Sequence, residues 1–118
     1  MSGIIPQREV HQKGQKPAKV KALRDAPRNN HCKLHIPGVC RQQDEYTIGA
    51  HMRFFSVAGM AEKPDDVFII DACDRCHDVL DHRDQWEANG LGWEDVLRAF
   101  MFTIWSRRQS GLITLAGE

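Results

Sequence analysis

Val67-Phe68-Ile69-Ile70-Asp71-Ala72-Cys73-Asp74-Arg75-Cys76-His77 lies near the middle of this 118-residue chain. Its first four residues are β-branched or aromatic and predict a strand. The strand leads directly into a C-x2-C turn, whose short spacer places both sulfurs on the same side, as tetrahedral metal coordination requires. Asp74 is a residue type suited to capping a helix, so we expect a helix from Asp74 to about Asn89-Gly90.

The two cysteines of this stretch belong to a set of four, at C-x7-C followed by C-x2-C: Cys32, Cys40, Cys73 and Cys76. In a reducing cytosol such spacing favours metal ligands over disulfides. We expect a structural Zn²⁺ held by all four thiolates, with no position left for a reacting water. The alternatives are buried thiols, or a redox pair at Cys73 and Cys76, although the βαβ context of such a pair is absent. His31 or His35 could also replace one thiolate.

A second strand is expected at Glu45–His51, followed by a link over residues 52–66 that is long for a hairpin and therefore typical of a functional loop. The order strand, loop, strand, C-x2-C, helix predicts an α+β fold in which zinc clamps a β-hairpin and a helix. A further helix is expected over 93–109, because its apolar residues follow a helical period. We expect these residues to face the core: Trp93, Val96, Leu97, Phe100, Met101, Ile104 and Trp105.

Charge divides the chain in two. Residues 1–30 hold seven basic and two acidic groups, whereas the remainder holds nine basic and fourteen acidic groups, and the formal net charge is zero. This asymmetry suggests a nucleic-acid partner. We expect a flexible basic arm at 1–28, with a short helix near Ala18–Arg24, and a zinc-stabilised domain at 29–118. The chain contains no apolar run long enough to span a membrane and no signal peptide, so a cytoplasmic protein is expected.

Three residues form a pattern that could carry chemistry. His51 ends the first strand, His77 follows Cys76 directly, and Asp81 lies one helical turn after His77, so both share a helix face. An imidazole and a carboxylate at this spacing can hold a divalent cation and leave positions open to water and phosphate. Taken singly, each has a simpler explanation as a structural or solvated residue.

These features resemble the ββα-metal fold of HNH endonucleases. More closely, the chain resembles the YbcO-like nuclease family of phages and prophages over about residues 28–113. The motifs that carry the resemblance are Cys-Lys-Leu-His-Ile-Pro-Gly-Val-Cys at 32–40, Thr-Ile-Gly-Ala-His at 47–51, Lys-Pro-Asp-Asp at 63–66, Ala-Cys-Asp-Arg-Cys-His-Asp-Val-Leu-Asp at 72–81, and Arg107-Arg108-Gln109 with Gly111-Leu112-Ile113.

The resemblance implies a role for each matching residue. His51 would be the general base, His77 a ligand of the catalytic cation, and Asp81 a second helical ligand. Asp66 would replace the middle Asn, which orients the loop and the histidine. Ala50 departs from the pattern, because HNH enzymes commonly have Asp or His before the catalytic histidine. Either Asp65 or Asp66 supplies the missing ligand, or phosphate completes the shell, or catalysis is impaired.

The expected function is therefore metal-dependent hydrolysis of DNA by an HNH-like endonuclease using Mg²⁺ or Mn²⁺, with a phage recombination or replication role and partners from those systems. Four bases near these elements could contact phosphates, or could simply be solvated: Arg53, Lys63, Arg75 and Arg83. The main alternative is a zinc-containing nucleic-acid-binding module without catalysis; a thiol oxidoreductase is more remote. The apolar helix 93–109 and the tail Leu112-Ile113-Leu115 could also support a homodimer.

Overall fold

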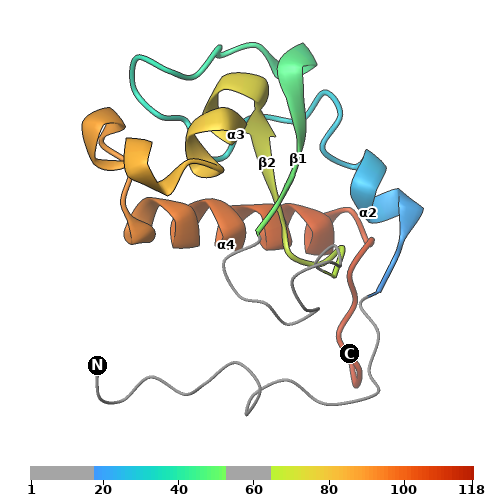
Figure 1. The fold of residues 1–118 in the computed structure, drawn as a ribbon. Coiled ribbons are helices and arrows are strands. Elements are labelled where there is room, and N and C mark those ends of the chain that lie inside the picture. The colour runs from blue at the N-terminus through green and yellow to red at the C-terminus, as the bar shows by residue number, and fades with distance from the viewer. Residues whose placement is uncertain (1–17, 53–64) are drawn as a thin grey trace, which may run out of the picture.

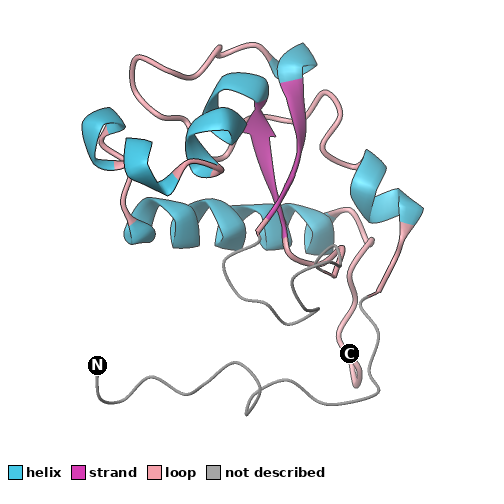
Figure 2. Cartoon of the chain, in the orientation of Figure 1, coloured by secondary structure: helices cyan, strands magenta, loops and turns pink. Residues whose placement is uncertain are grey.

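Two antiparallel strands form the centre of the fold (Figures 1 and 2). In the computed structural model, which describes residues 18–52 and 65–118, β1 spans Thr47–His51 and β2 spans Ile69–Cys73. The register pairs Thr47 with Cys73 and His51 with Ile69. His51 therefore lies at the loop end of the hairpin, and the C-x2-C turn begins at the opposite end. The expected α+β hairpin is confirmed.

Helices surround this hairpin. Helix α2 (Lys21–Asp25) precedes it, α3 (Asp74–Leu80) follows β2 directly, and α4 (Trp93–Gln109) packs mainly against β2. Short 3-10 turns connect these elements: η1 (Asp44–Tyr46), η2 (Arg83–Gln85) and η3 (Glu87–Asn89). No helix within the described ranges is both long enough and apolar enough to cross a membrane.

Both strands begin two residues later than the sequence predicted. Glu45 and Tyr46 belong to η1, and Val67 and Phe68 belong to a turn. The Asp65 side chain explains this turn, because its Oδ1 accepts the Val67 N–H at 2.9 Å and its main-chain carbonyl accepts the Phe68 N–H at 2.9 Å. An aspartate that caps its own turn competes with ladder pairing and delays the strand.

Helix α3 is shorter than predicted, ending at Leu80 instead of near Asn89. The Trp86 indole N–H donates to the Leu80 carbonyl at 3.1 Å, and this bond closes the chain back on the end of α3. Trp86 is buried, so the chain must turn to bring it into the core. Gly90 then ends the 3-10 segment at φ 73°, a left-handed conformation that glycine adopts without strain.

The core lies on both sides of β2, whose five residues are all buried. Ile70, Ala72 and Ala50 occupy its centre, together with apolar residues from the cysteine loop, α3 and α4. Buried and exposed residues therefore do not alternate along β2, because helices and loops cover both of its faces.

A buried ion pair joins β2 to α4. Asp71 is fully buried in β2, and its carboxylate bonds to the Arg107 guanidinium and, at 3.3 Å, to the Lys33 ammonium. The Thr103 hydroxyl accepts the Asp71 N–H at 3.2 Å and donates to the Ala99 carbonyl at 2.9 Å. The inner face of α4 is thus held largely by hydrogen bonds and small side chains.

The apolar residues of α4 do not face the core as the sequence predicted. Val96 is buried, and Phe100 and Ile104 are half-buried. The other four of the seven residues expected to face the core are exposed: Trp93, Leu97, Met101 and Trp105. The physical reason is the Asp71–Arg107 pair, which turns the face bearing Ala99, Thr103 and Arg107 inward.

Residues 18–28 also differ from the expectation of a flexible arm. The Asp66 N–H donates to the Ala18 carbonyl at 3.0 Å, and Pro27 packs over Gly49 of β1. A Cβ at position 49 would lie 3.1 Å from the Pro27 ring, so glycine permits this close approach. The short helix expected near Ala18–Arg24 is present as α2.

The buried ion pair gives a stability prediction with a matched control. Replacing Arg107 with Met leaves the Asp71 carboxylate buried with only Lys33 beside it, so we expect the free energy of unfolding to fall by about 3–5 kcal/mol. The neighbouring Arg108 forms a part-exposed pair with Glu118, so Arg108→Met should cost less than about 1 kcal/mol. Denaturant unfolding followed by circular dichroism measures both, and equal losses would contradict this assignment.

Candidate functional site

Four sulfur atoms meet between the 32–40 loop and the junction of β2 with α3. The Sγ atoms of Cys32, Cys40, Cys73 and Cys76 all lie within 4.8 Å of one another, and those of Cys40 and Cys73 are 4.0 Å apart. A tetrahedral metal with metal–sulfur bonds of about 2.3 Å separates its sulfurs by about 3.8 Å. The cluster can therefore hold a metal ion with little movement.

The main chain around the cluster is shaped to donate hydrogen bonds to sulfur. The His35 N–H donates to Cys32 at 3.5 Å, and the Gln42 N–H donates to Cys40 at 3.4 Å. Both donors have positive φ values, 49° and 58°, which ordinary loops seldom adopt. The side chains of His31 and His35 do not join the group, so the four cysteines are its whole donor set among the described residues.

The thiols influence one another strongly. A hydrogen bond from Cys76 lowers the pKa of Cys32 to about 4, and the same bond, with burial, raises the pKa of Cys76. Burial also raises the pKa of Cys40 to about 11. Within this cluster the pKa of Cys32 is therefore lowered and those of Cys40 and Cys76 are raised, and a bound cation would favour the ionised form of each thiol.

The second group is a histidine and a carboxylate at the loop end of the hairpin. His51 Nε2 lies 2.9 Å from Asp66 Oδ1, and their side chains are 14% and 5% exposed. Burial alone would raise the pKa of Asp66, but hydrogen bonds from His51, Val20 and Arg24 lower it below its usual value. An ionised carboxylate only accepts, so Nε2 carries a proton, and in the neutral imidazole Nδ1 then carries the lone pair.

Helix α2 and the residue before it hold this carboxylate in place. Asp66 Oδ2 accepts the Val20 N–H at 2.6 Å and the Arg24 guanidinium at 2.8 Å. The sequence did not predict these partners, because Val20 and Arg24 were expected to belong to the flexible basic arm. Nothing in their spacing separates Arg24 from the other bases around it, because the contact joins residues 42 positions apart.

The third group lies on α3. His77 Nε2 and Asp81 Oδ2 are 3.1 Å apart, one helical turn from each other as the spacing predicted. Their side chains are 27% and 41% exposed, so both remain accessible to solvent. The next pair along the chain, Asp78 and His82, is more exposed, and a hydrogen bond to the Asp78 carbonyl raises the pKa of His82.

The two histidine–carboxylate pairs do not form one close group of metal-ligand atoms in the described part of the chain. Among the residues that the structure describes, only the cysteines bring three or more metal-ligand atoms together. Ala50 is fully buried opposite Ile70, and both Asp65 oxygens accept main-chain N–H groups, at 2.7 and 2.9 Å. Asp65 is therefore already occupied as a turn cap.

The four predicted phosphate contacts have different surroundings. Arg75 is exposed on α3, and Arg53 and Lys63 lie outside the described residues. The Arg83 guanidinium lies over the rings of Trp86 and Trp93, at 4.8 and 4.5 Å from their centroids. Stacking therefore gives Arg83 a structural role on the outside of the core.

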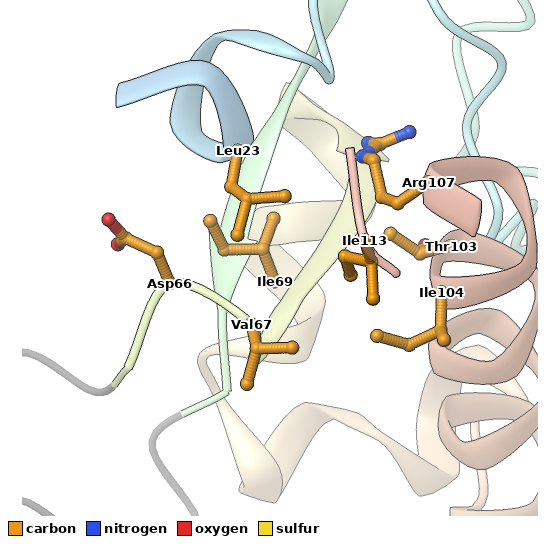
Figure 3. Close-up of a pocket in the computed structure, with 8 residues that line it drawn as sticks. All are labelled: Leu23, Asp66, Val67, Ile69, Thr103, Ile104, Arg107 and Ile113. Atoms are coloured by element: carbon orange, nitrogen blue, oxygen red, sulfur yellow. The ribbon is translucent and has the colours of Figure 1, made fainter. Parts of the chain in front are cut away.

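A small apolar pocket lies beside Asp66 (Figure 3). Leu23 of α2, Ile69 of β2 and Ile113 of the C-terminal tail face one another across it, while the Asp66 carboxylate points away. The pocket therefore lies where α2 approaches the sheet and the C-terminal tail. Helix α2 and the residue before it supply Arg24 and Val20 to the carboxylate.

Comparisons with known proteins agree with this architecture. The profile of the family described as "Putative nuclease YbcO" matches residues 21–111. A protein of that name from Escherichia coli K12 is 36% identical over 85 residues, which cover 70% of this chain and 88% of the relative. The ybcO protein of Enterobacteria phage 82 matches equally well.

A solved structure is also similar. It is described as a putative bacteriophage protein from E. coli K-12 MG1655, and it shares 31% identity with a TM-score of 0.60 over 76% of this chain and 100% of that chain. The family match covers most of the chain and includes all four cysteines and both histidine–carboxylate pairs. The chain therefore belongs to the YbcO nuclease family.

Proposed function

We propose that this protein is an HNH-like, metal-dependent DNA endonuclease that hydrolyses phosphodiester bonds with His51 as general base. The observation that carries the proposal is the His51–Asp66 pair. The buried carboxylate orients the imidazole and holds the proton on Nε2, which leaves Nδ1 to take a proton from water. Membership of a family described as "Putative nuclease YbcO" supports the reaction class.

In the proposed step, a water oxygen attacks phosphorus as its proton passes to His51 Nδ1. The bond between phosphorus and the 3′ oxygen breaks, and the departing oxygen takes a proton from solvent. Asp66 stays ionised and stabilises the imidazolium that forms, because it accepts the Nε2–H at one oxygen while Val20 and Arg24 hold the other.

The residues that we propose to hold the catalytic cation are His77 and Asp81. They offer one nitrogen and one carboxylate on an accessible helix face, and phosphate oxygens and water would complete the shell. When bound, Mg²⁺ or Mn²⁺ supplies positive charge for the phosphate and the departing oxygen.

For the cysteine cluster we propose structural Zn²⁺. Four sulfur donors at tetrahedral spacing match its preference, and no position is left for a reacting water. Cys73 and Cys76 bracket the start of α3, so zinc would fix the direction in which His77 and Asp81 project.

The proposed partner is DNA, with Arg75 and the bases of the N-terminal region contacting phosphates. Work on DNA would place the protein in the cytoplasm. The phage origin of one relative supports a link to phage recombination or replication.

A zinc-containing DNA-binding module without catalysis is the second candidate. It is favoured because the described residues of the two histidine–carboxylate pairs do not form one close metal-ligand group, and because Ala50 stands where a third ligand would be expected.

Nicking of supercoiled DNA in Mg²⁺, in Mn²⁺ and in chelator separates the two candidates. We expect the wild type to nick DNA only with a cation and His51→Ala to lose at least about 100-fold in rate, because it lacks the base. Asp66→Asn should also slow the reaction, whereas His31→Ala, which changes an exposed histidine bonded to Asp44, should not.

Each variant must retain wild-type zinc content and melting temperature. Cleavage by His51→Ala at the wild-type rate would refute the assignment of the base. Cation-independent DNA binding without nicking would favour the non-catalytic module.

The cysteine pKa values predict how zinc binding depends on pH. At pH 6 to 8 Cys32 is already ionised, whereas Cys40 and Cys76 must lose their protons to bind metal. Affinity should therefore rise by at least about 100-fold per pH unit, because at least two protons are displaced for each ion. Competition with a chromophoric chelator, corrected for its own protonation, measures this slope, and an affinity independent of pH would contradict it.

The bases of residues 1–17 can be removed without disturbing the described domain. Deleting residues 1–17 removes Arg8, Lys13 and Lys16 but keeps the contacts of Ala18, Val20 and Arg24 with the domain. We expect weaker DNA binding. The slope of the logarithm of the binding constant against the logarithm of the salt concentration should fall in magnitude by about 0.9 for each phosphate that the arm no longer neutralises.

Replacing the three bases with Gln in the full chain is the matched control. It should lower the slope as much as the deletion does. An unchanged slope in both variants would show that the arm does not contact DNA.

A further inference from the structure

Helix α4 carries an apolar face that points away from the core. Its residues are Leu97, Met101, Phe102 and Trp105, whose exposed fractions are 58%, 61%, 54% and 60%. In Figure 1 α3 lies on one side of α4, and the two strands pass across the helix. The fold does not need this face, because Val96, Ala99, Thr103 and Arg107 make the buried contacts of the helix.

The size of this α4 face matches one half of a protein interface. Four large side chains exposed to this extent present on the order of 500 Å² of mostly apolar surface, near the upper limit for a monomer. A standard interface buries about 800 Å² on each partner, so this face and its polar rim would supply most of one side.

The order of residues along the face is symmetric about Met101. Leu97 precedes Met101 by four positions, and Trp105 follows it by four. Glu94 precedes Met101 by seven positions, and Arg108 follows it by seven, so both lie near the same line, two turns away in each direction. An acidic end and a basic end thus flank an apolar centre.

We propose that the α4 face is a homodimer interface, in which a second copy of this chain packs its own α4 antiparallel to the first. A two-fold axis through Met101 brings Leu97 of one copy against Trp105 of the other. It also brings Glu94 of one copy to Arg108 of the other, at both ends. Such reciprocal pairing is what an isologous interface requires.

The charges at the two ends of the α4 face favour a second copy of the chain as the partner that covers it. The antiparallel arrangement places opposite charges together twice, whereas a parallel arrangement would place Glu94 beside Glu94 and Arg108 beside Arg108. Within one chain Glu94 bonds to Arg98 at 3.2 Å, and Arg108 bonds to Glu118 at 3.1 Å. The first pair is largely exposed and the second is part-exposed, so exchanging them for pairs between copies costs little.

Sedimentation equilibrium of the full chain over about 1 to 100 μM tests the proposal. We expect a mass twice the 13.5 kDa of one chain, and we expect Leu97→Asp to raise the dissociation constant by at least 100-fold, because it buries a charge in the interface. Leu115→Asp is the matched control: Leu115 is 57% exposed but lies beyond the end of α4, so the dimer should persist.

Charge reversal tests the antiparallel geometry. Glu94→Arg and Arg108→Glu should each weaken the dimer about tenfold, and the double variant should recover it, because the opposite charges meet again. Circular dichroism and zinc content check that every variant folds.

Three results would overturn the proposal. They are a wild type that stays monomeric at 100 μM, a dimer that survives Leu97→Asp, and a double charge reversal that fails to restore association. In the first case the face is covered by another part of the chain or by a different protein.

Discussion

The cysteine cluster is the constraint on which the rest of the structure depends. It ties the loop over residues 32–40 to the end of β2 and the first turn of α3, two segments more than 30 residues apart in the chain. An isolated two-stranded hairpin is only marginally stable in water, so this hairpin needs additional links. Because Cys73 caps α3 and Cys76 lies in its first turn, the cluster also sets the direction of the helix that carries His77 and Asp81.

A buried ion pair fixes which face of α4 meets the central strand. Asp71 in the central strand requires cationic partners, and Arg107 and Lys33 supply them. Once Arg107 points inward, helical periodicity also brings Ala99 and Thr103 to the strand and turns Leu97, Met101 and Trp105 outward. A helix whose apolar residues are available for another surface is therefore a consequence of one aspartate in β2.

The sequence predicted those features that local spacing controls and missed those that depend on distant contacts. The C-x2-C turn, the helix after it, the hairpin and the bounds of α4 all follow from short patterns. The end of α3 depends on Trp86 reaching back to Leu80, and the inward face of α4 depends on Asp71. For the site, the pairing of His77 with Asp81 is local and was expected. The support of Asp66 by Val20 and Arg24 joins segments more than 40 residues apart, so no spacing rule could reveal it.

The carboxylates that contribute to the zero net charge differ in the partners that hold them. Four acids within residues 65–74 are held by groups that are cationic at every physiological pH or by main-chain N–H groups: Asp65, Asp66, Asp71 and Asp74. Those on α3 and just beyond it, Asp78 and Asp81, are paired with His82 and His77, which are cationic only when protonated. A phosphate that approaches α3 therefore meets negative charge that only protonation of these histidines or a bound cation can offset. If the protein acts on DNA as proposed, binding of DNA to this face and binding of the cation must be coupled, and each must strengthen the other.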